Sequence, residues 1–204
     1  MSARDEILSG IRARRVRNAS RPAPYKLPPL AKETVAQFVE RARASGADVQ
    51  HLSGMKDVPA AVAEALRARN LAAIVHLPPD AQADTLPWDA APGVTLAREL
   101  PGGDDTALSV APYAIAETGT LAFVSDAESP ASWHFRPGFE IAILRAGNIL
   151  PHLESVLARV KSAGAFPHTL NLVTGPSRTG DIEQTLELGA HGPKALAIFL
   201  VDGE

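Results

Sequence analysis

Short apolar runs alternate along this chain with segments whose apolar residues recur at helical spacing. The runs are nearly continuous, as is typical of strands buried on both faces of a parallel sheet. They predict strands at 49–52, 71–77, 94–96, 119–125, 139–144, 170–174 and 195–201, with a further apolar run at 108–110. Amphipathic spacing predicts helices at 32–44, 58–69 and 150–161. The alternation indicates an α/β fold of three layers, with a mostly parallel sheet and helices on both faces.

The first thirty residues differ from this pattern. Residues 2–19 are predicted to be helical, because Ile7, Leu8 and Ile11 share one face and acidic residues stand in the first turn. Residues 20–30 hold four prolines and are interpreted as an extended linker. The predicted organisation is therefore a helix with a proline-rich linker at 1–30 and an α/β domain at 31–204. The arginines of the helix fit a solvated face, with a phosphate- or partner-binding arm as the alternative.

Composition narrows the classes of function. A chain of 204 residues with 46% hydrophobic content suits one domain with a substantial core. A net charge of −3 gives no indication of a nucleic-acid partner. The sequence has no cysteine, which excludes disulfides, zinc–thiolate sites and cysteine-ligated iron–sulfur clusters on this chain. No apolar run approaches the roughly 20 residues of a membrane span, and the charged N-terminus lacks a signal-peptide core. We therefore expect a cytoplasmic protein, and a homo-oligomer is left open.

A polar turn at residues 175–183 is the first candidate site. It directly follows an apolar run and packs glycine, proline, hydroxyl and charged residues together. Backbone N–H groups and the hydroxyls of Ser177 and Thr179 are suited to surround an anion, and the Arg178 guanidinium can hold it with two hydrogen bonds. The alternative is an exposed loop arginine paired with a carboxylate of the same turn.

A second turn, at residues 189–193, carries His191 between glycines. Flanking glycines such as Gly192 let the backbone approach a ligand, and an imidazole can act as acid, base or metal ligand near pH 7. The alternative is a histidine that fixes a tight turn. No second histidine stands at metal-binding spacing, so no metal site is predicted.

A third turn, at residues 116–120, precedes another apolar run. Glu117 is a candidate general base or covalent nucleophile, or else a carboxylate that accepts backbone hydrogen bonds in its turn. Thr118, Gly119 and Thr120 are candidate substrate-binding residues. Polar turns at neighbouring strand ends are expected to form one crevice in an α/β fold.

The segment 133–136 is unusually aromatic for this chain, because it holds a tryptophan and a phenylalanine beside a histidine and an arginine. It fits a lid over a small ligand or an oligomer contact. The dinucleotide fingerprint, the phosphate-binding loop of ATPases, the calcium-loop spacing and the hydrolase serine elbow are all missing from the sequence.

The three turns in this order and spacing resemble the LUD-domain family, and within it the branch of lactate-utilization protein C. The resemblance covers about residues 30–202, and the three motifs together are far more specific than any one alone. One position departs from the pattern. Many members carry a Pro-x-x-His-Ile segment before the strand at 139–144, whereas this chain has Glu140 in place of that histidine.

The resemblance implies the three-layer α/β fold shared by sugar-phosphate isomerases and CoA transferases. It also implies a role in the oxidation of L-lactate to pyruvate, together with partner subunits that carry iron–sulfur clusters. A chain without cysteines fits a non-redox subunit of such a system, which contributes small-anion binding or assembly. In this interpretation Arg178 holds the lactate carboxylate and His191 contacts the 2-hydroxyl group.

Two other interpretations remain. The chain fits a stand-alone enzyme or binder that acts on a phosphorylated or CoA-linked metabolite, with Glu117 as nucleophile or base; this rests on fold analogy. It also fits a structural adaptor whose pocket has lost its function. Neither the ligand nor the convergence of the three turns follows from the sequence.

Overall fold

Six strands form the central sheet of the computed structural model, which describes residues 2–14, 22–23, 25–30, 32–79, 81–164, 167–180 and 186–202. All six strands are parallel, in the order β1-β12-β7-β4-β2-β3. Their bounds are β1 Asp48–Leu52, β2 Ile74–His76, β3 Thr95–Ala97, β4 Thr106–Ala111, β7 Phe139–Arg145 and β12 Ala195–Val201. The parallel sheet and the α/β class are therefore confirmed.

Strand β7 shows why these runs are continuously apolar. Ile141 and Ile143 belong to the core on one face of the sheet, while Ala142 and Leu144 belong to the core on the other. Successive side chains of a strand point to opposite faces, so a strand buried on both faces needs apolar residues at nearly every position, with Glu140 as the exception in β7. Burial at this strand is nearly complete, and its neighbours β4 and β12 pair with it over six and seven residues.

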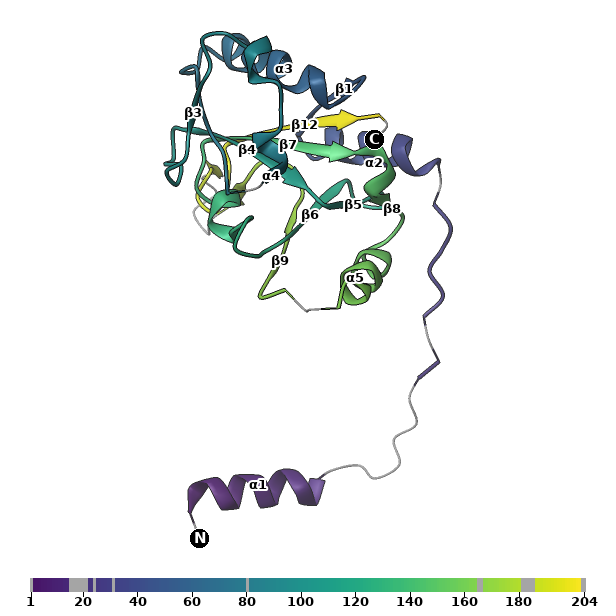
Figure 1. Ribbon diagram of the computed structural model, residues 1–204. Coiled ribbons are helices and arrows are strands. Elements are labelled where there is room, and N and C mark those ends of the chain that lie inside the picture. Colours follow the sequence, from purple (N-terminus) through teal and green to yellow (C-terminus); the bar gives the residue numbers. More distant parts are fainter. Residues whose placement is uncertain are drawn as a thin grey trace.

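One face of the sheet is covered by α3 Val58–Ala68, with α4 Ala81–Asp84 and a short 3₁₀ turn, Trp88–Ala90, beside it. The other face packs against α2 Thr34–Ala44 and against a second sheet of four strands in the order β8-β5-β6-β9. Helix α5 Leu153–Ser162 packs on that second sheet. Figure 1 shows α3 and α5 at opposite ends of this layered arrangement. The second-sheet strands are β5 Tyr113–Ile115, β6 Thr120–Val124, β8 Ile149–Leu150 and β9 Leu170–Val173.

The second sheet is not part of the sequence prediction. Residues 119–125 and 170–174 are predicted as strands, but they pair antiparallel with each other as β6 and β9, outside the central sheet. The short strands β5 and β8, and the hairpin of β10 Arg178–Gly180 with β11 Leu186–Leu188, are missed altogether. Strands of two or three residues carry too few positions for a periodic pattern.

The turn between β5 and β6 fixes the second sheet to α2. Gly119 has φ of 68°, and a Cβ placed on it would lie 2.2 Å from the backbone N of Ala42. Only glycine permits both this backbone conformation and this close approach. The turn is thereby held against the last turns of α2.

The N-terminal helix α1 Ala3–Arg14 lies within the predicted 2–19, and residues 15–19 lie outside the described part of the chain. Its apolar residues Ile7 and Ile11 are more than half exposed. No helix in the described residues is long and apolar enough to cross a membrane. The division at residue 30 stays a prediction.

Candidate functional site

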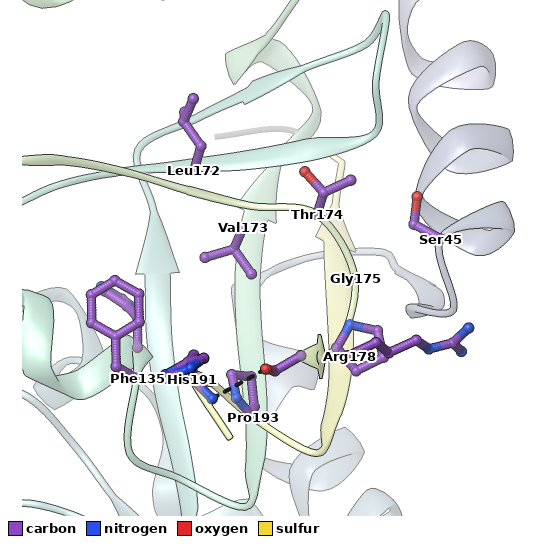
Figure 2. A pocket seen from close by; sticks show the side chains of 13 residues that line it. Ser45, Phe135, Leu172, Val173, Thr174, Gly175, Arg178, His191 and Pro193 are labelled. Carbon is purple, nitrogen blue, oxygen red and sulfur yellow. Dashed lines mark hydrogen bonds between the residues drawn. The ribbon is translucent and has the colours of Figure 1, made fainter. Parts of the chain in front are cut away.

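A cavity of about 440 Å³ lies among the segments that lead into β1, β7 and β12. We call it the amino-edge pocket, because these parallel strands begin beside it. Figure 2 shows the side chains around it. Hydroxyl, imidazole and guanidinium groups stand there beside apolar side chains: Ser45, His134, Phe135, Leu172, Val173, Thr174, Gly175, Pro176, Ser177, Arg178, His191, Gly192 and Pro193.

Ser177 joins the two turns that were predicted to bind a ligand. Its backbone N–H donates to the carbonyl of Pro193 at 2.8 Å, and its carbonyl accepts the N–H of Gly189 at 3.1 Å. Its Oγ accepts a further hydrogen bond from the backbone N–H of His191 at 3.3 Å. The two turns therefore form one wall of the pocket, and four of the predicted residues lie in it: Ser177, Arg178, His191 and Gly192.

Arg178 and His191 share this wall but point apart (Figure 2). The Arg178 guanidinium extends to the loop after α2, where a Cβ placed on Gly46 would lie 2.7 Å from Nη2. The carboxyl end of a helix attracts a cation, so this contact gives the arginine a structural role beside any ligand. Thr179 belongs to β10, and its side chain lies outside the described part of the chain.

The turn at 116–120 reaches the amino-edge pocket through a chain of hydroxyl groups. Thr118 Oγ1 lies 2.7 Å from Thr120 Oγ1, which in turn lies 2.7 Å from Thr174 Oγ1. The contact follows from topology, because β6 begins where its antiparallel neighbour β9 ends. Thr174 lines the pocket, whereas the other two threonines support it from behind.

Glu117 lies apart from this pocket. Its carboxylate lies 2.9 Å from Nδ1 of His152, the buried residue that precedes α5, and its backbone N–H donates to the carbonyl of Pro151. Glu117 is not among the pocket's lining residues. The two residues predicted as catalytic, Glu117 and His191, are therefore not brought together.

A buried polar trio borders the pocket, and sequence reasoning did not find it. Glu140 Oε1 accepts hydrogen bonds from Ser109 Oγ at 2.8 Å and from His134 Nδ1 at 2.7 Å. The side chains of Glu140 and His134 are both 0% exposed, and the imidazole stacks on Phe123 with ring centroids 3.8 Å apart. Burial of a carboxylate is costly unless hydrogen bonds compensate it. The hydrogen bonds from Ser109 and His134 therefore stabilise the Glu140 carboxylate between the two sheets.

Further polar atoms gather around the trio. Four buried side-chain atoms have no hydrogen-bond partner among the described residues: Trp133 Nε1, His134 Nε2, Glu140 Oε2 and Asn171 Nδ2. Asn171 is the antiparallel partner of Phe123, on which His134 stacks, so these atoms share one region beside the pocket. Unpaired buried polar atoms are uncommon in folded proteins, where a water or another bound group usually satisfies them.

The one available sequence signal for the trio is Glu140 itself. It is a charged residue within a strand of otherwise apolar residues. The aromatic segment 133–136 is divided in the structure. Trp133 and His134 are buried, while Phe135 is 48% exposed and lines the pocket. Among the described residues, no three His, Asp or Glu side chains gather closely enough to hold a metal ion.

The pocket and the two sheets lie within a recognisable domain. Residues 35–201 match the LUD domain. The chain belongs to the LUD domain family. It is 34% identical over 91 residues to "Lactate utilization protein C" of Geobacillus kaustophilus, a match that covers 43% of this chain and 38% of that protein. It is 31% identical over 122 residues to "Uncharacterized protein YkgG" of Escherichia coli, covering 56% and 52%.

The fold has a solved relative. A crystal structure of a DUF162 family protein from Deinococcus radiodurans superposes with a TM-score of 0.59 at 24% identity, covering 86% of this chain and all of that one. At this identity the likeness concerns the fold alone. The chain spans about half or less of the length of the two curated relatives, so their names do not by themselves assign an activity to it.

Proposed function

We propose that this LUD domain is a non-redox subunit of an L-lactate utilization system and that its amino-edge pocket binds the small carboxylate. Relatives named for lactate utilization support the system. The absence of cysteine supports a non-redox role for this chain. Iron–sulfur clusters need thiolate ligands, which partner subunits would have to supply. In this proposal the chain binds the small carboxylate and helps to assemble the complex with its partner subunits.

The observation that carries the proposal is the joining of the 175–180 and 189–193 turns at Ser177. It places the Ser177 hydroxyl and the His191 imidazole on one wall, with Thr174 in the same pocket. Hydroxyl and imidazole groups can donate to a carboxylate and exchange hydrogen bonds with a 2-hydroxyl. A pocket of about 440 Å³ is large enough for a three-carbon acid. Arg178 lines the same pocket at the margin nearest α2, where its guanidinium points away from His191 (Figure 2).

Titration calorimetry with L-lactate and pyruvate tests this proposal, on the purified chain and on the chain co-purified with its iron–sulfur partners. We expect His191→Ala and Ser177→Ala each to weaken binding at least tenfold. His51→Ala is the matched control, because His51 is exposed on β1 and outside this pocket. Binding of neither acid by either preparation would overturn the proposal.

One observation favours a second candidate, a stand-alone enzyme with Glu117 as base. The hydrogen bond from His152 orients the Glu117 carboxylate, which is still 45% exposed. Carboxylate–imidazole pairs are common in acid–base chemistry. Turnover of acyl-CoA or sugar-phosphate substrates that is lost in Glu117→Gln would support this candidate over the first.

A further inference from the structure

A second cavity, of about 380 Å³, lies at the opposite edge of the central sheet. We call it the carboxyl-edge pocket, because β4 and β7 end beside it. Residues Val110 and Ala111 at the end of β4 and Arg145 at the end of β7 line it, and Val124 at the end of β6 closes it from the second sheet. Open α/β sheets bind ligands outside the carboxyl ends of their strands. The fold therefore places this cavity where a ligand is expected.

Two arginines from different elements line this cavity. Arg145 ends β7 and Arg159 lies on α5. Neither side chain makes a hydrogen bond or ion pair with another described residue. Arg41 and Arg178 likewise have no such partner among the described residues. Five other arginines of the domain are fixed by carboxylates or carbonyls: Arg43, Arg67, Arg69, Arg98 and Arg136. Within the described part of the chain, no carboxylate or carbonyl binds the two guanidinium groups of the cavity, so both can hold an anion.

The opposite wall is acidic but does not neutralise these arginines. Asp126 Oδ1 accepts the backbone N–H groups of Glu128 and Ser129 at 2.9 and 2.7 Å, so this oxygen is engaged within its own turn. No described ion pair joins Asp126 or Glu128 to either arginine. The cavity thus offers cationic donors on one side and carboxylate acceptors on the other. A ligand that satisfies both sides has an anionic group and, a few atoms away, hydroxyl donors.

The half-buried lining residues fit the same ligand. Asn148 offers an amide that both donates and accepts, and Tyr113 offers a phenol beside a flat ring. Two guanidinium groups suit a phosphate monoester, which carries a charge of about −1.5 to −2 at pH 7 and three acceptor oxygens. A carboxylate has one charge and two oxygens and can satisfy one guanidinium fork.

We propose that the carboxyl-edge pocket binds a small hydroxylated phosphate ester, with Arg145 and Arg159 holding the phosphate and the 126–129 turn accepting its hydroxyl groups. The pocket is separate from the amino-edge pocket and shares none of its lining residues. The proposal therefore stands whether or not the chain binds lactate.

The test is titration calorimetry of the full chain with glycerol 3-phosphate, inorganic phosphate and L-lactate at constant ionic strength. We expect glycerol 3-phosphate to bind more tightly than inorganic phosphate, because only the ester brings hydroxyl groups to the acidic turn. Arg145→Ala and Arg159→Ala should each weaken its binding at least tenfold. Lys161→Ala is the matched control, since Lys161 carries the same charge on the same helix but does not line the cavity. It should change binding less than twofold.

Two outcomes would overturn the proposal. One is wild-type protein that binds neither phosphate compound, with the thermal unfolding midpoint showing that it is folded. The other is equal affinity in the arginine variants and the Lys161→Ala control. If Arg145→Ala does not fold, Arg159→Ala decides alone, because that side chain is exposed on α5. A Glu128→Gln variant should bring the affinity for the ester closer to that for inorganic phosphate; an unchanged preference would contradict the role of the acidic turn.

Discussion

Replacing Glu140 by glutamine tests how much the Glu140 carboxylate contributes to the buried trio. Glutamine has nearly the same shape, and its carbonyl oxygen can still accept from Ser109 and His134. Two changes follow from the geometry. Both hydrogen bonds lose the carboxylate charge, at about 1 kcal/mol each. The new amide NH₂ takes the place of Oε2, which also has no described partner, so one unpaired buried group replaces another and adds no further cost.

The two weakened hydrogen bonds together give a loss of about 2 kcal/mol in the free energy of unfolding. Urea unfolding at pH 7, followed by circular dichroism, measures it. With a slope of about 2 kcal/mol per molar urea, the midpoint should fall by about 1 M. Glu154→Gln on the exposed face of α5 is the control and should change stability by less than about 0.5 kcal/mol.

A double replacement separates hydrogen bonding from packing. Glu140→Met combined with His134→Phe fills the same space with apolar groups and keeps a ring against Phe123. Replacing both partners of a buried hydrogen bond by apolar groups of similar shape can be nearly neutral in stability, so the double variant should be more stable than Glu140→Gln alone. A midpoint for Glu140→Gln within 0.2 M of wild type would refute the reasoning, because it would mean that the carboxylate is neither buried nor bonded as the structure shows.

Three further predictions concern the surroundings of the site. Gly119→Ala should destabilise the fold by about 3 kcal/mol or more, from backbone strain and the clash with α2, while Gly147→Ala meets open space and stays near wild type in thermal unfolding. Thr120→Val should cost about 1 kcal/mol in urea unfolding, since its two exposed neighbours regain water. The hydrogen bond and charge of Lys32 lower the pKa of Glu40. This pair therefore stabilises the fold above the usual carboxyl pKa and stops doing so as the pH falls through the lowered value, so unfolding midpoints of wild type and Glu40→Gln should converge in acid.

The sequence predicted the bounds of strands well where burial on both faces of the sheet requires apolar residues at nearly every position. Strand β12 has the predicted bounds, and β7 differs by one residue. The same logic could not separate the two sheets. Strand β6 is as apolar as β7, because both lie in the interior, and composition does not record which neighbour a strand pairs with. Pairing partners depend on loop paths and long-range contacts, which periodicity does not contain.

The two turns that form one wall of the candidate site could be predicted from the sequence, because both contain glycines. The turns at 175–180 and 189–193 meet where Gly192 lies against Ser177, and Gly175 lets the first turn approach Ser45 at the end of α2. The direction of side chains was not predictable. Arg178 turns toward α2, a contact that depends on the position of a helix more than 130 residues earlier in the sequence. Nothing in the sequence singles out Arg145, because one arginine at the end of a strand is common. Its proposed role follows only from the structure, in which Arg159 of another element lines the same cavity.

Strand β7 links the two proposed sites and keeps them apart. Glu140 lies at its start beside the amino-edge pocket, and Arg145 ends it at the carboxyl-edge pocket. Five residues of parallel strand span about 16 Å, which is longer than a three-carbon acid or its phosphate ester. One small ligand cannot fill both pockets, so each variant should affect one ligand only. If His191→Ala weakened phosphate binding or Arg145→Ala weakened lactate binding, the rigid strand between them would have to transmit the change, and two independent sites would no longer describe this domain.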